Sequence, residues 1–276
     1  MYQASNSGLI STSSRDLNAF KMVKPKTIAE AVSYLNDFDS VPVAYAGGVD
    51  LATAYRENKQ IGTLVWLKEI DEISDITVSD DNLRIGALVT HGQGSANEKL
   101  ACVRGLQESW GKIANVRIRF SATIGGNLMA LRTSYEMPIL LSALKARINF
   151  ANKDGLFTLA ADEMSQTPRL TGALLTSVDI PLKGKPQIDY ERSMRPLYTQ
   201  ATVKFQDGDN SLIRIVIATE HLPPYIFEIS ERLEDFDRIF ESLPPDYADL
   251  RLDNNYIRYL IPVILKRQIK RLAKGQ

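Results

Sequence analysis

Two Gly-Gly pairs constrain this chain more than any other feature of its sequence. The first stands in A-Y-A-G-G-V-D-L at 44–51 and the second in S-A-T-I-G-G-N-L-M at 121–129. Each pair leaves a short apolar run and precedes a small polar side chain, Asp50 or Asn127. Glycine permits a positive φ and a close approach to the main chain, and successive exposed amides form a concave anion site. One pair predicts a turn, whereas two suggest loops that face one diphosphate-like ligand from opposite sides.

The alternative is ordinary turn chemistry, because Gly-Gly after a strand is common in turns. Neither pair fits the G-x-G-x-x-G pattern of a Rossmann nucleotide site or the G-x-x-x-x-G-K-[ST] pattern of a P-loop. The spacing of the two pairs alone therefore leaves both interpretations open.

Apolar patterning predicts strands interspersed with helices and joined by hairpins, which is typical of an α+β fold. Thr27 and Glu30 are placed to cap a helix over 25–35. The expected strands are 41–46, 63–67, 76–78, 83–89, 147–151, 156–159, 174–181, 188–193, 201–206 and 212–219. The further expected helices are most of 92–115, then 137–144, 225–242 and 254–273, the last kinked by Pro262.

Composition excludes several classes of protein. The 276 residues carry 33 basic and 33 acidic side chains, so no net charge draws the chain to nucleic acid or to an anionic membrane. No apolar run approaches the roughly 20 residues of a membrane span, and the start lacks signal-peptide features. We therefore expect a cytoplasmic protein. One cysteine, Cys102, and two histidines, His91 and His221, predict no disulfide, metal site or iron–sulfur cluster within the chain.

Several motifs carry a resemblance to a known family. A-G-G-V-D-L, L-R-I-G-A-L-V-T-H and T-I-G-G-N-L followed by E-M-P-I-L-L-S-A-L occur in this order. Together they resemble the flavin-binding subunit of molybdenum hydroxylases, which includes the medium subunit of carbon monoxide dehydrogenase and the flavin domain of xanthine dehydrogenase. The opening F-K-M-V-K-P-K-T-I-A-E-A-V, then Y-E-R-S-M-R and Y-I-R-Y-L-I-P-V-I-L-K-R, are similar to the family as well.

The resemblance implies a two-part FAD-binding domain of the vanillyl-alcohol oxidase (PCMH) type, followed by a smaller α+β domain with an antiparallel sheet. We assign the first domain to 18–183 and the second to 187–276, because K-G-K-P-Q at 183–187 has the composition of a linker. The Ser- and Asn-rich residues 1–17 are expected to form a flexible arm.

By position, the resemblance also implies the cofactor site. The main chain of Ala46, Gly47, Gly48, Val49 and Asp50 would hold one side of the FAD diphosphate. Thr123, Ile124, Gly125, Gly126 and Asn127 would hold the other side and the flavin edge. Further implied contacts are Glu136 to a ribose hydroxyl, Leu174 or Leu175 to the isoalloxazine or adenine pocket, and Arg192 near the flavin. No catalytic residue is implied.

One stretch departs from the family pattern. Small residues are usual between Asn127 and the carboxylate, but this chain has L-M-A-L-R-T-S-Y at 128–135. Arg132 either pairs with a phosphate of FAD or fills part of the pocket, and Tyr135 is bulky too. Phe120 and Ser121 stand where Asn and Arg are common. This departure bears on FAD affinity more than on the fold.

Other residues have plainer interpretations. We expect His91 in a surface loop, Cys102 as a small buried residue, and Trp66 and Trp110 in the core. Tyr190 and Arg192 share one face of a strand, which is compatible with a sheet edge or with a flavin contact.

The function implied by the resemblance is electron transfer by FAD. A large partner would carry molybdenum–pterin and a small one [2Fe-2S] clusters, and the flavin would pass electrons to oxygen, a quinone or NAD. Two alternatives are a scaffold subunit that has lost FAD and an independent flavin oxidase. The latter is less favoured because no substrate-binding cap is evident.

Overall fold

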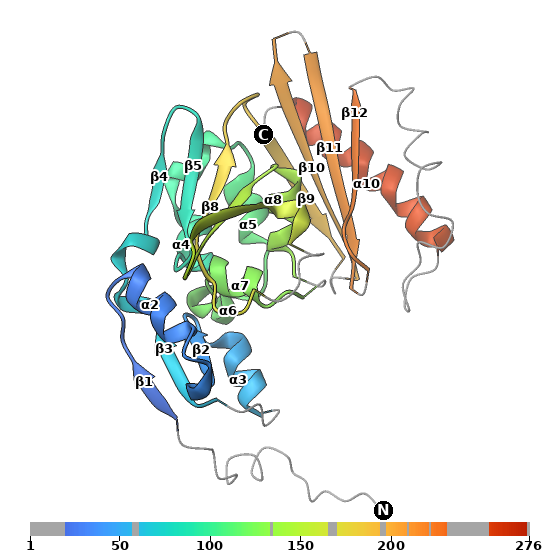
Figure 1. The fold of residues 1–276 in the computed structure, drawn as a ribbon. Helices are drawn as coiled ribbons and strands as arrows, with labels where there is room; N and C mark the ends of the chain where they lie inside the picture. The colour runs from blue at the N-terminus through green and yellow to red at the C-terminus, as the bar shows by residue number, and fades with distance from the viewer. Residues whose placement is uncertain are drawn as a thin grey trace, which may run out of the picture.

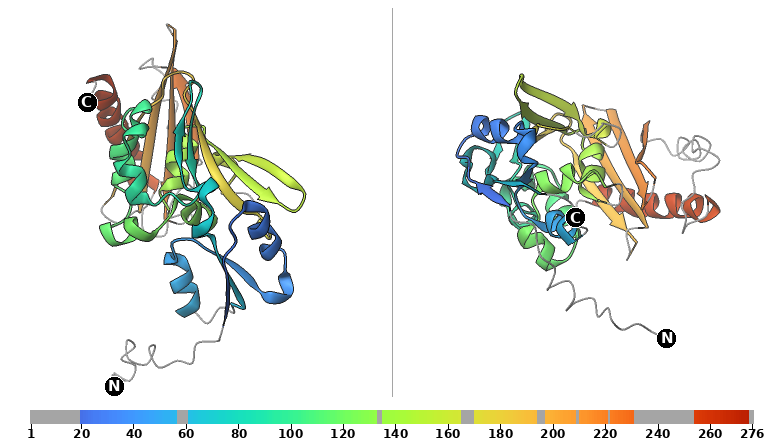
Figure 2. Two further views of the ribbon diagram at one scale, coloured as in Figure 1. Left: turned by 90° about the vertical axis from the view of Figure 1, so that its left-hand side faces the viewer. Right: turned by 60° about the horizontal axis from the view of Figure 1, so that its bottom comes forward.

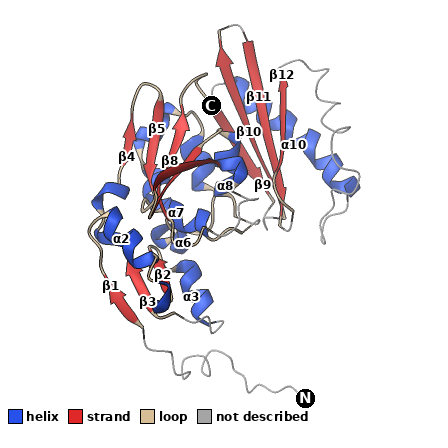
Figure 3. Cartoon of the chain, viewed as in Figure 1, coloured by secondary structure: helices blue, strands red, loops and turns tan. Residues whose placement is uncertain are grey.

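The computed structural model describes residues 20–56, 61–132, 135–164, 170–193, 197–208, 210–220, 222–230 and 254–274. Its described strands form three sheets, which Figure 1 shows in sequence from the N-terminal unit at the lower left to the C-terminal sheet at the right. Helices lie between and beside the sheets (Figure 3). The architecture is α+β, as the sequence predicts. The expected N-terminal arm, 1–17, lies outside the described residues.

The N-terminal unit is a small parallel sheet with the strand order β1-β3-β2. Its elements are β1 (Lys21–Val23), α2 (Ile28–Leu35), β2 (Pro42–Tyr45), α3 (Val49–Arg56) and β3 (Thr63–Trp66). The predicted cap of α2 is confirmed, because the Thr27 hydroxyl accepts a hydrogen bond from the Glu30 amide at 3.2 Å. Helix α3 follows Gly47 and Gly48 directly, so the first glycine pair joins a strand end to a helix start.

A five-stranded antiparallel sheet forms the middle of the molecule, with the order β4-β5-β8-β6-β7. Its strands are β4 (Ile76–Val78), β5 (Asn82–Gly86), β6 (Arg147–Asn152), β7 (Gly155–Ala160) and β8 (Leu174–Pro181). Between β5 and β6 the chain inserts α4 (His91–Ala96), α5 (Leu106–Gly111), α6 (Val116–Ser121), α7 (Ile124–Met129) and α8 (Met137–Ala143). The strands predicted at 76–78 and 83–89 form one hairpin, and those predicted at 147–151 and 156–159 form a second. Figure 2 shows the β6–β7 hairpin projecting from the body.

The C-terminal part is a four-stranded antiparallel meander covered on one face by a helix (Figure 1). Its elements are β9 (Gln187–Arg192), β10 (Tyr198–Asp207), β11 (Asn210–Thr219), β12 (Tyr225–Ser230) and α10 (Asn254–Lys274). Alternate residues of β11 serve two cores. Ile215 and Ile217 pack toward α10, whereas Val216 and Ala218 belong to the core shared with the rest of the chain.

A buried arginine reinforces this junction. Arg214 on β11 is 7% exposed, and its Nε donates to the Ser142 carbonyl at the end of α8 at 2.9 Å. Its guanidinium also pairs with Asp162 and Glu228. A buried cation needs such partners because desolvation is costly. The C-terminal sheet is therefore anchored to the middle of the molecule.

One predicted element is wrong. Residues 225–230, expected to begin a helix, form β12 and pair with β11. Phe227 and Ile229 are buried while Glu228 between them is exposed, which is the two-residue period of a strand rather than that of a helix. Residues 231–242 of the expected helix lie outside the described residues. The helix expected over 254–273 is confirmed as α10, which contains Pro262, and the kink at Pro262 stays a prediction.

Candidate functional site

Gly47 brings the two glycine segments into contact. A Cβ at Gly47 would lie 2.0 Å from the carbonyl oxygen of Ser121 and 3.1 Å from the Cα of Ala122. These two residues end α6 and lead into Thr123 and α7. Figure 1 shows α3 of the N-terminal unit next to α6 and α7. The two segments predicted to act together therefore meet where the N-terminal unit joins the inserted helices.

The start of α3 presents unused amide donors. Gly48 has a φ of 76°, a left-handed conformation that favours glycine. Within the described part of the chain, the amides of residues 47–51 donate to no carbonyl or side chain, and the helix ladder begins with Ala52 donating to Gly48 at 2.9 Å. The helix dipole adds positive potential at this end. The segment thus has the properties of an anion site.

The second glycine pair differs from the sequence hypothesis. Gly125 and Gly126 lie inside α7 and not in a loop, with Thr123 as N-cap. The Gly126 amide donates to the Thr123 hydroxyl at 3.1 Å. The other amides of this turn donate to carbonyl oxygens at 2.9 Å: Ile124 to Val89, Gly125 to Ala87, and Asn127 to Thr123. The expectation of free amides on this side is therefore wrong, because the helix cap and the adjoining turn use them.

The second segment offers other groups to a ligand. Gly126 is exposed, and the nearest atom to a Cβ built on it is Thr123 Oγ1 at 3.1 Å. The Oδ1 atom of Asn127 is buried with no hydrogen-bond partner among the described residues. Since buried polar atoms are normally paired, this amide oxygen is available to a donor on a bound molecule. Gly125, in contrast, packs against Ala87, whose Cβ and carbonyl oxygen would each lie 2.9 Å from an added Cβ.

Asp50 is tied to the segment that follows α7. Its Oδ1 lies 3.1 Å from Nε of Arg132, and the Tyr135 hydroxyl donates to Oδ1 at 2.9 Å and to Oδ2 at 3.0 Å. Burial, followed by the hydrogen bond to Asp50, raises the pKa of Tyr135 to about 12, so its hydroxyl keeps its proton. Arg132 therefore faces Asp50. Sequence reasoning missed the partnership of Tyr135 with Asp50, because nothing in the spacing of the two residues signals it.

Glu136 lies in a second, more buried cluster. It is 6% exposed, and its Oε1 accepts from the Tyr190 hydroxyl at 3.0 Å and pairs with Arg192 Nη1 at 3.1 Å. Burial raises the pKa of Glu136, while Arg192, the Tyr190 hydroxyl and the Ala114 amide act in the opposite direction. The shared strand face predicted for Tyr190 and Arg192 is confirmed, and both reach one carboxylate. A ribose hydroxyl would have to share Glu136 with these partners.

The remaining implied residues occupy different surroundings. Leu174 and Leu175 begin β8 and are 4% and 3% exposed within the main core. They lie at an irregularity in the β6–β8 pairing, where Phe150 faces Leu175. Ala46 is half-buried beside Gly47.

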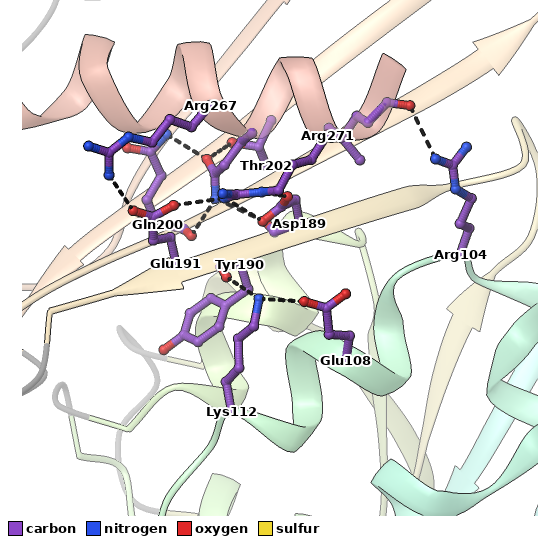
Figure 4. Close-up of polar contacts among 12 residues, drawn as sticks. Arg104, Glu108, Lys112, Asp189, Tyr190, Glu191, Gln200, Thr202, Arg267 and Arg271 are labelled. Atoms are coloured by element: carbon purple, nitrogen blue, oxygen red, sulfur yellow. Dashed lines mark hydrogen bonds and ion pairs between the residues drawn. The ribbon is translucent and has the colours of Figure 1, made fainter. Parts of the chain in front are cut away.

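A cavity of about 350 Å³ opens beside Arg192 and is lined by Lys112, Tyr190, Glu191 and Arg271 as well. Figure 4 shows why its cations are held in place. Lys112 donates to the Tyr190 carbonyl at 3.1 Å and pairs with Glu108 at 3.0 Å. Arg271 pairs with Asp189 and with Glu191. These contacts join α5 and α10 to β9 and fix the strand that carries Arg192.

Three plainer expectations need correction. His91 is fully buried, not in a surface loop, because it begins α4 and its Nδ1 accepts a 2.8 Å hydrogen bond from Trp110. Burial, with a smaller influence of Arg119, lowers the pKa of His91 to about 4. Cys102 is exposed at the end of a short 3₁₀ helix. Trp110 lies in the core as expected, but Trp66 is only half-buried, against Tyr45.

Residues 18–183 match the family described as FAD binding domain in molybdopterin dehydrogenase. The chain belongs to this family. The matched residues include both glycine segments, Asp50, Arg132 and Glu136, so these parts of the site lie within the FAD-binding domain, whereas Tyr190 and Arg192 come after the matched residues.

Curated relatives are subunits or parts of dehydrogenases and oxidases. The carbon monoxide dehydrogenase medium chain of Afipia carboxidovorans is 30% identical over 173 residues, 59% of each chain. The caffeine dehydrogenase subunit beta of a Pseudomonas species is 26% identical over 130 residues, 46% of this chain and 44% of the relative. The glyceraldehyde dehydrogenase medium chain of Sulfolobus acidocaldarius is 22% identical over 92% of this chain and 98% of its own. The chain spans about half the length of the first two in these matches.

Solved structures show the same fold over nearly the whole chain. A chain of the Cu,Mo carbon monoxide dehydrogenase superposes with a TM-score of 0.81 at 23% identity, covering 95% of this chain and 100% of that one. A chain of quinoline 2-oxidoreductase from Pseudomonas putida 86 gives 0.80 at 22% identity, covering 95% and 99%. At these identities the likeness concerns the fold alone.

The residues of the site fit FAD. The free amides at the start of α3 suit a diphosphate, and the unpaired Asn127 oxygen suits a donor on the cofactor. Among the described residues, no group of His, Cys, Asp and Glu is arranged to hold a metal ion, and no helix is long and apolar enough to cross a membrane.

Proposed function

We propose that this chain is the FAD-binding, electron-transferring subunit of a molybdenum hydroxylase complex. The observation that carries the proposal is the row of unused amides at residues 47–51, held against the second glycine segment by Gly47. The match of 18–183 to an FAD-binding family supports the same conclusion. FAD, when bound, accepts electrons and passes them on, and the protein supplies position and electrostatics.

The residues divide the work of holding FAD. The main chain of Ala46, Gly47, Gly48, Val49 and Asp50 would bind the diphosphate. Thr123, Ile124 and the buried Gly125 would support α7 at its start. Gly126 and Asn127 would offer the second side of the site, through the exposed glycine and the Asn127 side-chain oxygen rather than through amides. The remaining implied contacts, Glu136, Leu174, Leu175 and Arg192, stay predictions.

The partners follow from what this chain lacks. One cysteine cannot hold an iron–sulfur cluster, so the [2Fe-2S] centres and the molybdenum–pterin would reside on a small and a large partner subunit. Relatives named medium chain and subunit beta support such a division. Residues 187–276 would form the C-terminal domain, whose β9 carries Arg192 toward the site. Oxygen, a quinone and NAD remain the proposed classes of electron acceptor.

An absorption spectrum of the purified chain tests the proposal. We expect bands of an oxidised flavin in the blue and near-ultraviolet, and one FAD released per chain on denaturation. Co-purification with the large and the small partner subunit would distinguish an electron-transfer subunit from an independent oxidase. A folded, colourless protein that gains no flavin from excess FAD would support a scaffold subunit instead.

A further inference from the structure

We propose that Arg132 and Tyr135 promote FAD binding through Asp50, by neutralising and holding aside a carboxylate that stands at the diphosphate end of α3. The inference rests on the proposed function. It differs from the expectation that Arg132 itself binds a phosphate or merely fills space.

Asp50 is placed where a negative charge interferes with an anion. It is the second residue of α3, beside the unused amides of residues 47–51. Acidic side chains in a first helical turn often accept from those amides, but Asp50 accepts from none of them among the described residues. Its carboxylate and a bound diphosphate would carry like charges at the same helix end, and like charges repel.

The structure turns this carboxylate toward two donors. Both of its oxygens accept from the Tyr135 hydroxyl, at 2.9 and 3.0 Å, and Oδ1 also pairs with Arg132 at 3.1 Å. The Arg132 guanidinium lies 5.9 Å from the centre of the Tyr135 ring, so the two donors support each other. The amides of α3 are thereby left free for a ligand.

The backbone before Arg132 supports a built arrangement. Leu131 has a φ of 49°, in the left-handed region that residues with a Cβ rarely adopt, and it donates to the Leu128 carbonyl to close α7. This turn directs the chain from the end of α7 back toward α3, where Arg132 and Tyr135 meet Asp50.

A double-mutant cycle separates action through Asp50 from direct contact. FAD is titrated into the flavin-free full-length protein, and affinity is read from the quenching of flavin fluorescence. Arg132→Ala should weaken FAD about tenfold in the wild-type background but less than about twofold in an Asp50→Asn background. Asp50→Asn alone should bind at least as tightly as wild type, because it removes the repelling charge.

Conservative variants and the dependence on ionic strength distinguish an electrostatic role of Arg132 from a purely structural one. Arg132→Lys should keep most of the wild-type affinity for FAD, since it keeps the charge. Tyr135→Phe should weaken FAD binding about threefold, but only in a background that retains Asp50. The effect of Arg132→Ala should shrink at high ionic strength, because half-exposed charges are screened. These variants also serve if Arg132→Ala fails to fold.

Arg84→Ala is the matched control. Its Nε lies 3.1 Å from Asp179 Oδ1 on the β5–β8 surface, the same separation as in the Arg132–Asp50 pair, and affinity for FAD should be unchanged. Equal losses for Arg132→Ala in both Asp50 backgrounds, or none in either, would overturn the inference while leaving the proposed function intact. Wild-type protein that binds no FAD would overturn both.

Discussion

The carbonyl oxygen of Ser121 lies 2.0 Å from the position that a Cβ on Gly47 would occupy. Backbone thus meets backbone at the junction of the N-terminal unit with the inserted helices, and neither side has a flexible side chain that can move away. This contact places the free amides of α3 beside Thr123 and α7. The cofactor site that we propose depends on it.

Gly47→Ala should therefore lower both folded stability and FAD affinity. The main chain must shift to admit the methyl group, and we expect a cost of roughly 1–3 kcal/mol in the free energy of unfolding, typical of overpacking. Urea denaturation and an FAD titration measure the two effects. Gly111→Ala is the control, since the nearest atom to its added Cβ is 3.9 Å away. Similar behaviour of the two variants would contradict the contact.

Gly125 and Gly126 should respond differently to substitution. Gly125→Ala meets Ala87 at 2.9 Å and should destabilise the fold. Gly126 lies in a helix, has no left-handed φ and is exposed. The melting temperature of the Gly126→Ala variant should therefore differ from that of wild type by less than about 4 °C, roughly 1 kcal/mol. Its FAD affinity should nevertheless fall if the cofactor approaches this surface. Unchanged affinity for Gly126→Ala would remove this glycine from the site.

His91 should make stability depend on pH. Its folded pKa of about 4 lies below the ordinary value of 6.5, so the unfolded chain binds more protons between these values. The contribution is fully present above about pH 6.5 and is lost as the pH falls toward 4. We expect about 2 kcal/mol less stability at pH 5 than at pH 7 from this group. His91→Gln, which keeps an acceptor for Trp110, should flatten that part of the profile, and an unchanged pH profile would contradict the assignment.

Glu136→Gln should leave the positive charge of Arg192 without its paired carboxylate. The variant removes the carboxylate that pairs with Arg192 and accepts from Tyr190, and we expect a loss of about 2 kcal/mol, less than for a fully buried pair because Arg192 reaches solvent. If Arg192 lies near the flavin, its uncompensated charge should also raise the flavin reduction potential in a spectroelectrochemical titration. Glu108→Gln, an exposed partner of Lys112, is the control and should change neither quantity.

Sequence reasoning was most successful where local pattern and fold agree. The Thr27 cap, the two hairpins and the meander strands all follow from short-range periodicity and turn residues. It failed at 225–230, where the chain forms β12 instead of the expected helix, and at His91, whose burial depends on Trp110 from another helix. Such packing is a tertiary property that a local pattern does not reveal.

The candidate site divides in the same way. The glycine pairs and Glu136 were identifiable from the motifs, and the free amides before α3 follow from a strand that runs into a helix through Gly47 and Gly48. The engagement of the Ile124 and Gly125 amides was not predictable, because it depends on Val89 and Ala87 reaching the turn from the end of β5. The pairing of Asp50 with Arg132 and Tyr135 likewise joins positions separated by more than eighty residues.

Titration of FAD into the purified, flavin-free chain tests the central claim most directly. The site predicts saturable quenching of flavin fluorescence at one FAD per chain, with inorganic diphosphate competing because both occupy the amides at residues 47–51. Protein that is folded by circular dichroism yet shows no quenching with excess FAD would contradict the account.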